Sequence, residues 1–235
     1  MEKQVEFKVG KETLRGSLFV PEGTGPFPAV IFFHGSGSKG LTYFETAKQL
    51  SEKGVLGFAF NFRGCGISDG KFGKITIGEG EEDAREALKL FLSQADVDKK
   101  RYGICGSSYG GFLAALISPD FNFKSMILSV PASYPKFAMK LKQGTLLSKI
   151  LKTEDFNNSE SYSKIKNFSG RLLVIRAEND EIIKPGMAEK YLESTDQALQ
   201  KEEFVIKNAK HEISKNPKAK RLLQKKIIDW FLETL

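Results

Sequence analysis

A serine flanked by glycines lies between an apolar segment and a helix-like segment. The stretch reads Gly106-Ser107-Ser108-Tyr109-Gly110, a G-x-S-x-G pattern. A nucleophile on a very sharp strand-to-helix turn needs neighbours without a Cβ two positions away on each side, because the turn cannot otherwise close. Such a turn exposes the Ser108 hydroxyl, and the helix beside it offers backbone N–H groups to a developing oxyanion. The pattern predicts a serine nucleophile; the alternative is a glycine-rich turn with an inert serine.

A serine nucleophile needs a general base, and the chain contains only two histidines, His34 and His211. His34 directly follows an apolar strand-like segment, where it is expected to shape a loop. His211 follows the last predicted strand and is the better candidate for the base.

Three carboxylates near one predicted strand end could orient the His211 ring. They are Glu178, Asp180 and Glu181, which follow the apolar segment 172–175. We prefer Asp180 as this acid. The order along the chain is then Ser108, Asp180, His211, which differs from the orders in the two best-known serine protease folds.

The rest of the chain alternates short apolar strands with helices. Strands are expected at 29–33, 54–60, 101–105, 125–130, 172–175 and 203–206, after an antiparallel hairpin formed by the first twenty residues. Helices are expected at 41–53, 80–93, 109–118, 186–193 and 217–235. This alternation predicts an α/β fold with a mostly parallel sheet that is covered on both faces. Such sheets bind ligands at the carboxyl ends of their strands.

Four motifs in this order resemble those of the α/β-hydrolase superfamily, of the serine esterase and peptidase type. His34-Gly35-Ser36 resembles its HG-x oxyanion loop, and the stretch 61–68 resembles its RGxGxS loop. Residues 106–111 resemble GxSYGG, and 177–183 resemble GxxDxxV with Ala177 in place of the usual glycine. The resemblance covers roughly residues 5–235. It implies a single α/β-hydrolase domain spanning residues 1–235.

The resemblance also implies a function. The protein would cleave ester-type bonds of a small-molecule acyl substrate through Ser108, Asp180, His211 and an acyl-enzyme, with the backbone N–H groups of Ser36 and Tyr109 as the oxyanion hole. No cofactor and no metal are implied. Alternatives are a peptidase or amidase similar to the prolyl oligopeptidases, a lipase or thioesterase, and a catalytically silent binding protein. Dienelactone hydrolases of this superfamily carry a cysteine at the elbow, where this chain has Ser108.

Residues 131–170 form a longer connection than a compact domain needs, so we expect a lid or cap here. Its apolar residues are spaced to give helical faces: Phe137, Leu141, Leu146, Leu147, Ile150 and Leu151. Its lysines are Lys136, Lys140, Lys142, Lys149 and Lys152, with no acidic residue between the first and the last. The alternative is a surface helix pair without a role in substrate binding.

Composition limits the function classes further. The chain has 235 residues and a net charge of +7, of which the five lysines of the expected lid supply most. With no nucleic-acid motif beside them, nucleic acid is not an expected partner. The first ten residues are charged and lack the apolar core of a secretory signal, and no later apolar run is long enough for a membrane span. A cytoplasmic location is therefore expected, with association at a membrane surface as an alternative.

Several other reactive side chains are expected to be bystanders. Cys105 should be a buried strand residue, Cys65 a loop residue near the site, and Asp69 a turn residue. The acidic residues Glu79, Glu81, Glu82 and Asp83 lie at a predicted helix start, where negative charge suits the helix dipole, and metal binding is the alternative.

Overall fold

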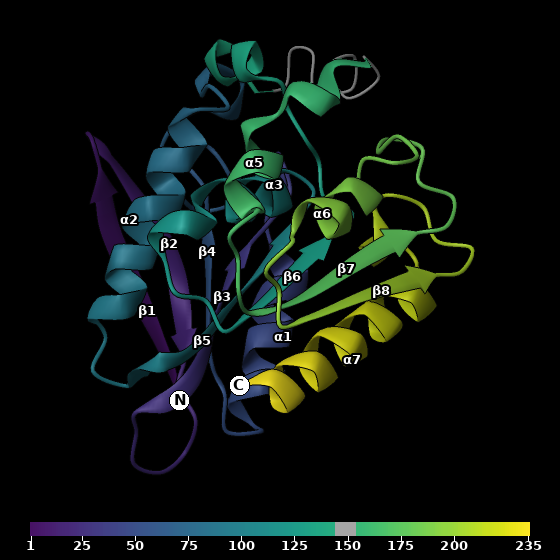
Figure 1. The fold of residues 1–235 in the computed structure, drawn as a ribbon. Coiled ribbons are helices and arrows are strands. Elements are labelled where there is room, and N and C mark those ends of the chain that lie inside the picture. Colours follow the sequence, from purple (N-terminus) through teal and green to yellow (C-terminus); the bar gives the residue numbers. More distant parts are fainter. Residues whose placement is uncertain (144–153) are drawn as a thin grey trace.

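The computed structural model describes residues 1–143 and 154–235, and their strands join in one eight-stranded sheet (Figure 1). The strands are β1 (Glu2–Val9), β2 (Glu12–Phe19), β3 (Phe27–Phe33), β4 (Leu56–Asn61), β5 (Val97–Ser107), β6 (Ser125–Ser129), β7 (Arg171–Ala177) and β8 (Gln200–Ile206). Their order across the sheet is β1-β2-β4-β3-β5-β6-β7-β8.

Six neighbouring strands of this sheet, from β4 to β8 across it, run parallel, whereas β1 and β2 form the antiparallel hairpin at one edge. Strands β3, β4, β6 and β7 are short, largely buried apolar runs because helices cover both of their faces. The predicted architecture is therefore confirmed. The carboxyl ends of β3, β5, β7 and β8 meet at one edge, and this edge carries every residue of the candidate site.

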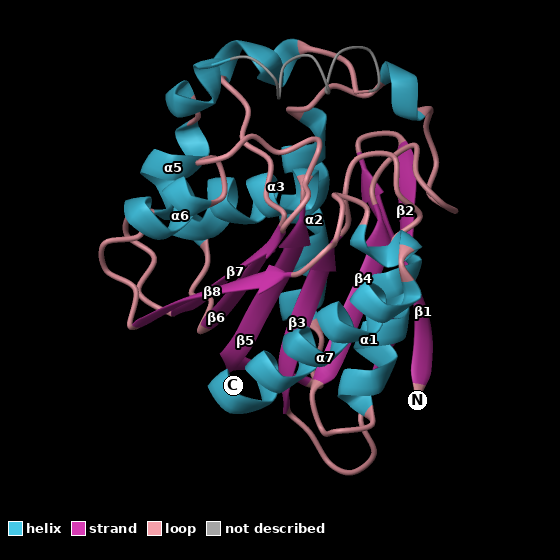
Figure 2. Ribbon diagram, turned by 90° about the vertical axis from the view of Figure 1, so that its right-hand side faces the viewer, coloured by secondary structure: helices cyan, strands magenta, loops and turns pink. Residues whose placement is uncertain are grey.

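The helices form two layers, one on each face of the sheet (Figures 1 and 2). Their bounds are α1 (Leu41–Ser51), α2 (Glu79–Ser93), α3 (Tyr109–Ile117), α5 (Glu160–Ile165), α6 (Glu189–Ser194) and α7 (Pro217–Thr234). Helices α1 and α7 pack on one face, and α2, α3, α5 and α6 lie on the other. Among the described helices, none has both the length and the apolarity needed to cross a bilayer.

The expected lid segment is described in two parts. Residues 136–140 and 154–158 form short 3₁₀ helices, and α5 follows them. Phe137 is exposed, while Leu141 packs against the core. Lys136 forms an ion pair with Glu160 at 2.8 Å. The remaining predicted positions lie outside the described residues: Leu146, Leu147, Lys149, Ile150, Leu151 and Lys152.

The acidic start of α2 anchors the loop after β4. Asp83 is fully buried and its carboxylate accepts hydrogen bonds from the Arg63 backbone N–H at 3.0 Å and from Arg63 Nε at 2.7 Å. Burial raises the Asp83 pKa to about 6, an effect that the Arg63 guanidinium opposes. Within the described ranges, no group of three or more His, Cys, Asp or Glu side chains could hold a metal ion. Glu79, Glu82 and Asp83 pair with Arg63, and Glu81 pairs with Arg85.

We predict that Asp83→Asn lowers the free energy of unfolding by about 3 kcal/mol, because it leaves the buried Arg63 charge without its main partner. Glu82 also contacts Arg63, at 3.1 Å, but its side chain is 66% exposed. Glu82→Gln is thus the matched control and should cost less than about 1 kcal/mol. Chemical denaturation of both variants measures the difference, and equal losses would contradict the assignment.

Candidate active site

Ser108 lies on a strained turn between β5 and α3. Its backbone has φ 51° and ψ −113°, a conformation that L-residues rarely adopt. A Cβ on Gly106 would collide with the backbone of Gly110, and a Cβ on Gly110 would collide with the carbonyl of Phe33 at the end of β3. The two glycines of the G-x-S-x-G pattern are therefore required by close approaches of the backbone.

The end of β6 fixes this turn from the other side. The Ser108 N–H donates to the Ser129 carbonyl at 2.9 Å, and the Ala132 N–H donates to the Ser108 carbonyl at 3.0 Å. Between these two contacts Val130 has φ 41°, which is a true outlier for a β-branched residue. Its own N–H donates to the Ile175 carbonyl on β7 at 2.7 Å. The unfavourable backbone conformations of Ser108 and Val130 are thus both held by hydrogen bonds to strands of the sheet.

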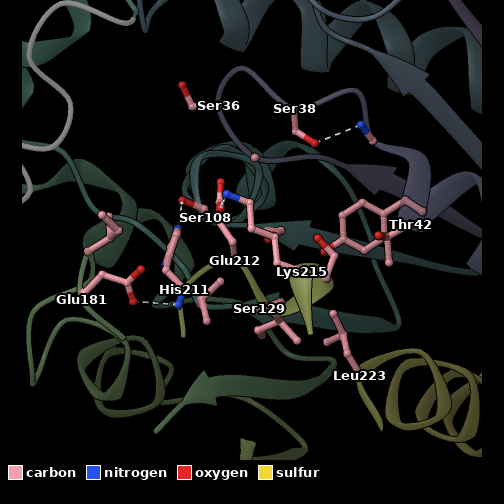
Figure 3. A pocket seen from close by; sticks show the side chains of 18 of the residues that line it. Ser36, Ser38, Thr42, Ser108, Ser129, Glu181, His211, Glu212, Lys215 and Leu223 are labelled. Carbon is pink, nitrogen blue, oxygen red and sulfur yellow. Dashed lines mark hydrogen bonds and ion pairs between the residues drawn. The ribbon is translucent and has the colours of Figure 1, made fainter. Parts of the chain in front are cut away.

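The loops after β7 and β8 bring two more side chains to Ser108. His211 Nε2 lies 3.1 Å from Ser108 Oγ, and His211 Nδ1 lies 2.9 Å from Asp180 Oδ2 and 3.1 Å from Oδ1. Figure 3 shows Ser108 and His211 side by side at the wall of the cleft. The structure therefore joins Ser108, His211 and Asp180 in one hydrogen-bonded chain. With Nδ1–H donating to Asp180, Nε2 is free to accept the serine proton.

The three acids after β7 have different partners. Asp180 Oδ1 also accepts the backbone N–H groups of Ile182 at 2.9 Å and Ile183 at 2.8 Å, which fix its carboxylate against the histidine ring. Glu178 instead accepts from Lys207 Nζ and from the Asn208 N–H, both at 2.8 Å. The Lys207 ammonium lowers the Glu178 pKa. Glu181 accepts the His211 backbone N–H at 3.2 Å. Of these three, only Asp180 contacts the ring.

The loop that leads to His211 turns sharply at Asn208, whose φ is 56°, in the left-handed region. Asparagine is among the non-glycine residues that tolerate this region best. Asn208 is therefore suited to the turn that leads to His211.

The two residues expected to form the oxyanion hole flank the nucleophile. Ser36 is the second residue of a turn closed by the Ser38 N–H and the Gly35 carbonyl at 3.1 Å, so its own N–H is not used in that turn. A Cβ on Gly35 would lie 3.6 Å from Ser108 Cβ, which places this loop directly beside the serine. The Tyr109 N–H is in the first turn of α3, where N–H groups have no partner within the helix.

A cleft of about 630 Å³ opens at Ser108 and His211. Its walls come from the loop after β3, the start of α1, the end of β6 and the segment after His211, as Figure 3 shows for part of the lining. Phe72 and Tyr134 also line it, and sequence reasoning did not single them out. Lys136, Lys140 and Lys142 do not line the cleft.

The remaining candidates from the sequence lie apart from the nucleophile. His34 Nε2 accepts the Phe62 N–H at 3.1 Å, so Nδ1 carries the proton and donates to the Gly35 carbonyl at 2.7 Å. Burial lowers the His34 pKa to about 4. Burial also raises the pKa of Cys65 to about 11 and that of Cys105 further, so neither thiol is a ready nucleophile.

Asp69 lies in the loop after β4 and contacts strand β2. Its carboxylate accepts the Thr13 N–H at 3.0 Å and pairs with the Arg15 guanidinium at 2.7 Å, which lowers the Asp69 pKa. It therefore has its own structural partners away from His211.

Comparison with known proteins places the chain in a family. Residues 42–235 match the model of the prolyl oligopeptidase family. Esterase EstD of Thermotoga maritima is 28% identical over 130 residues, which are 52% of this chain and 31% of that relative. The chain spans a third or less of the length of the first curated relatives it matches.

Solved structures share the fold across the whole chain. Est1E from Butyrivibrio proteoclasticus, with ferulic acid bound, has a TM-score of 0.77 at 17% identity and 98% coverage of both chains. An acylaminoacyl peptidase from Pyrococcus horikoshii has a TM-score of 0.78 at 20% identity, covering all of this chain and 42% of that one. These likenesses show the α/β-hydrolase fold. The chain belongs to the prolyl oligopeptidase family of α/β hydrolases.

The buried neutral His34 predicts a pH dependence of stability. Its pKa is about 4 in the folded protein against an ordinary 6.5, so unfolding takes up a proton between these values. The free energy of unfolding should therefore fall by about 3 kcal/mol as the pH drops through this window. His34→Asn removes the titrating group, and the difference between the two pH profiles in urea denaturation isolates it. Parallel profiles would contradict the prediction.

Proposed function

We propose that this member of the prolyl oligopeptidase family is a serine-dependent carboxylic ester hydrolase acting on small-molecule acyl substrates. The observation that carries the proposal is the hydrogen-bonded chain from Ser108 Oγ through His211 to Asp180. The nucleophile lies on a strained turn at the start of α3, where backbone N–H groups have no partner within the helix. This combination suits acyl transfer.

In the proposed first step, Ser108 Oγ attacks the ester carbonyl while its proton passes to His211 Nε2. The carbonyl oxygen becomes an oxyanion, which the backbone N–H groups of Ser36 and Tyr109 stabilise. Asp180 holds the Nδ1–H tautomer and stabilises the imidazolium that forms. Collapse of the tetrahedral intermediate breaks the ester C–O bond, and His211 Nε2–H protonates the departing alkoxide.

In the second step, water replaces the alcohol. His211 Nε2 takes a proton from the water as its oxygen attacks the acyl carbon of the Ser108 ester. The second tetrahedral intermediate releases the carboxylic acid, and the proton returns from His211 to Ser108 Oγ. The same three side chains and two backbone donors therefore serve both halves of the cycle.

The cleft supports a small acyl substrate. Its volume of about 630 Å³ lies in the range typical of small-molecule sites. Aromatic and aliphatic side chains line it, among them Phe72, Tyr134, Ile182 and Leu223. The fold of Est1E with ferulic acid bound adds support for an aromatic or apolar acyl group.

A peptidase or amidase activity is the second candidate. It is favoured by the family match and by the likeness to the Pyrococcus horikoshii acylaminoacyl peptidase. An amide differs from an ester in its poorer leaving group, which His211 must protonate. Comparing kcat/KM for an aminoacyl p-nitroanilide and the matched p-nitrophenyl ester distinguishes the two, and a preference for the anilide would overturn the esterase assignment.

Ser108→Ala should reduce hydrolysis of a short p-nitrophenyl ester by at least about 10³-fold, because it removes the nucleophile and keeps the fold. Steady-state kinetics on the purified variant give this value. Turnover close to wild type, in a preparation free of other hydrolases, would rule out Ser108 as the nucleophile.

The roles of the acids after β7 can be separated in the same assay. Asp180→Asn should lower kcat by about 10³- to 10⁴-fold, because the amide no longer fixes the histidine tautomer. Glu178→Gln is the matched control: Glu178 is on the same loop but contacts Lys207 and Asn208 rather than the ring. It should change kcat less than about threefold. A larger effect at Glu178 than at Asp180 would reverse the assignment.

A further inference from the structure

A short antiparallel ladder joins the connection after β6 to the segment before α2. We call residues 139–143 the strap. The N–H groups of Gly78 and Ile77 donate to the carbonyls of Met139 and Leu141, at 2.9 and 3.0 Å. The Gln143 N–H donates to the Ile75 carbonyl at 2.7 Å. Thr76 and Lys142 are paired in an antiparallel β-bridge between these hydrogen bonds. The strap is therefore fixed to the segment 75–78.

Both residues of the proposed oxyanion hole are tied to this ladder by their side chains. Ser36 Oγ donates to Gln143 Oε1 at 3.0 Å. The Tyr109 hydroxyl donates to the Ile77 carbonyl at 2.8 Å. The Tyr109 bond is buried, and the Ser36 bond is partly buried because its acceptor Gln143 is only 3% exposed. One strand of the ladder thus holds Ser36, and the other holds Tyr109.

The ladder is itself anchored to α2. Glu79 Oε2 accepts the Thr76 N–H and Thr76 Oγ1 accepts the Glu79 N–H, at 2.6 and 3.1 Å. A Cβ on Gly80 would collide with the Tyr109 hydroxyl, so the helix lies directly against that ring. Helix α2 is in turn fixed through Asp83 and Arg63. The hydrogen bonds of Ser36 and Tyr109 to the ladder therefore connect both residues to a part of the fold that is itself fixed.

The loop that carries Ser36 needs such a support. Ser36 lies between Gly35 and Gly37, and Gly37 has φ 68°. Glycines on both sides allow the loop many conformations, and most of them would turn the Ser36 N–H away from the carbonyl oxygen. An oxyanion donor acts only when it is held in place before the reaction.

We infer that Gln143 is a positioning residue: by accepting a hydrogen bond from the Ser36 hydroxyl, its side chain holds the Ser36 N–H in the oxyanion hole. The inference rests on the proposed function, since it assigns a support to that same site. A support of this kind acts on the transition state, where the oxyanion exists, and much less on binding of the neutral ester.

A double-mutant cycle tests the inference. Gln143→Leu removes the acceptor at similar volume, and Ser36→Ala removes the donor while keeping the backbone N–H. Each single variant should lower kcat for a p-nitrophenyl ester by about tenfold with KM changed less than about twofold. Because both variants break the same bond, the double variant should be about as active as either single variant.

Two outcomes would overturn the inference. One is a double variant in which the two losses multiply, since the residues would then act independently. The other is a loss confined to KM, which would make Gln143 a contact of the substrate. If Gln143→Leu does not fold, the test is made with Ser36→Ala alone. This variant should lower kcat and leave KM nearly unchanged. Lys140→Met, an exposed position on the strap that does not line the cleft, is the control and should behave as wild type.

Ser108→Ala, measured in the same series, separates the two claims. An inactive Ser108→Ala with an additive cycle would reject Gln143 as a positioning residue and leave the proposed function standing. An active Ser108→Ala would reject the proposed function itself.

Discussion

The positive φ of Ser108 is the constraint on which the rest of the site depends. It turns the chain sharply enough to lift the hydroxyl out of the end of β5, and the backbone can follow only because Gly106 and Gly110 lack a Cβ. Hydrogen bonds from the end of β6 hold the strained conformation on both sides of the serine. The contacts with the parallel sheet thus offset the unfavourable backbone conformation of Ser108.

The remaining parts of the site are held by contacts between loops that lie far apart in the sequence. Asp180 is fixed by two N–H groups of its own loop, and Glu181 joins the β7 loop to the β8 loop by accepting the His211 N–H. On the opposite side, the strap connects Ser36 to the segment before α2. The nucleophile, base and proposed oxyanion donors are therefore fixed from separate directions.

Local patterns in the sequence predicted the strand order in the chain, the parallel sheet and the loops that carry Ser108, Asp180 and His211. Those predictions rest on apolar runs and on glycine spacing, which act over a few residues. Ser36 and Gln143 are 107 positions apart in the sequence, and no local pattern around either residue predicts their contact. The strain at Val130 and the burial of Asp83 also arise from packing between distant elements. Such features depend on the assembled fold.

The central claim is that Ser108 forms a covalent acyl-enzyme. The most direct measurement mixes the enzyme with excess p-nitrophenyl acetate, follows p-nitrophenol in the first turnover and quenches the mixture for peptide mapping by mass spectrometry. We expect an initial burst equal to the enzyme concentration and one acetyl group, located on Ser108. Turnover without any adduct, or an acetyl group on another side chain during productive turnover, would contradict it.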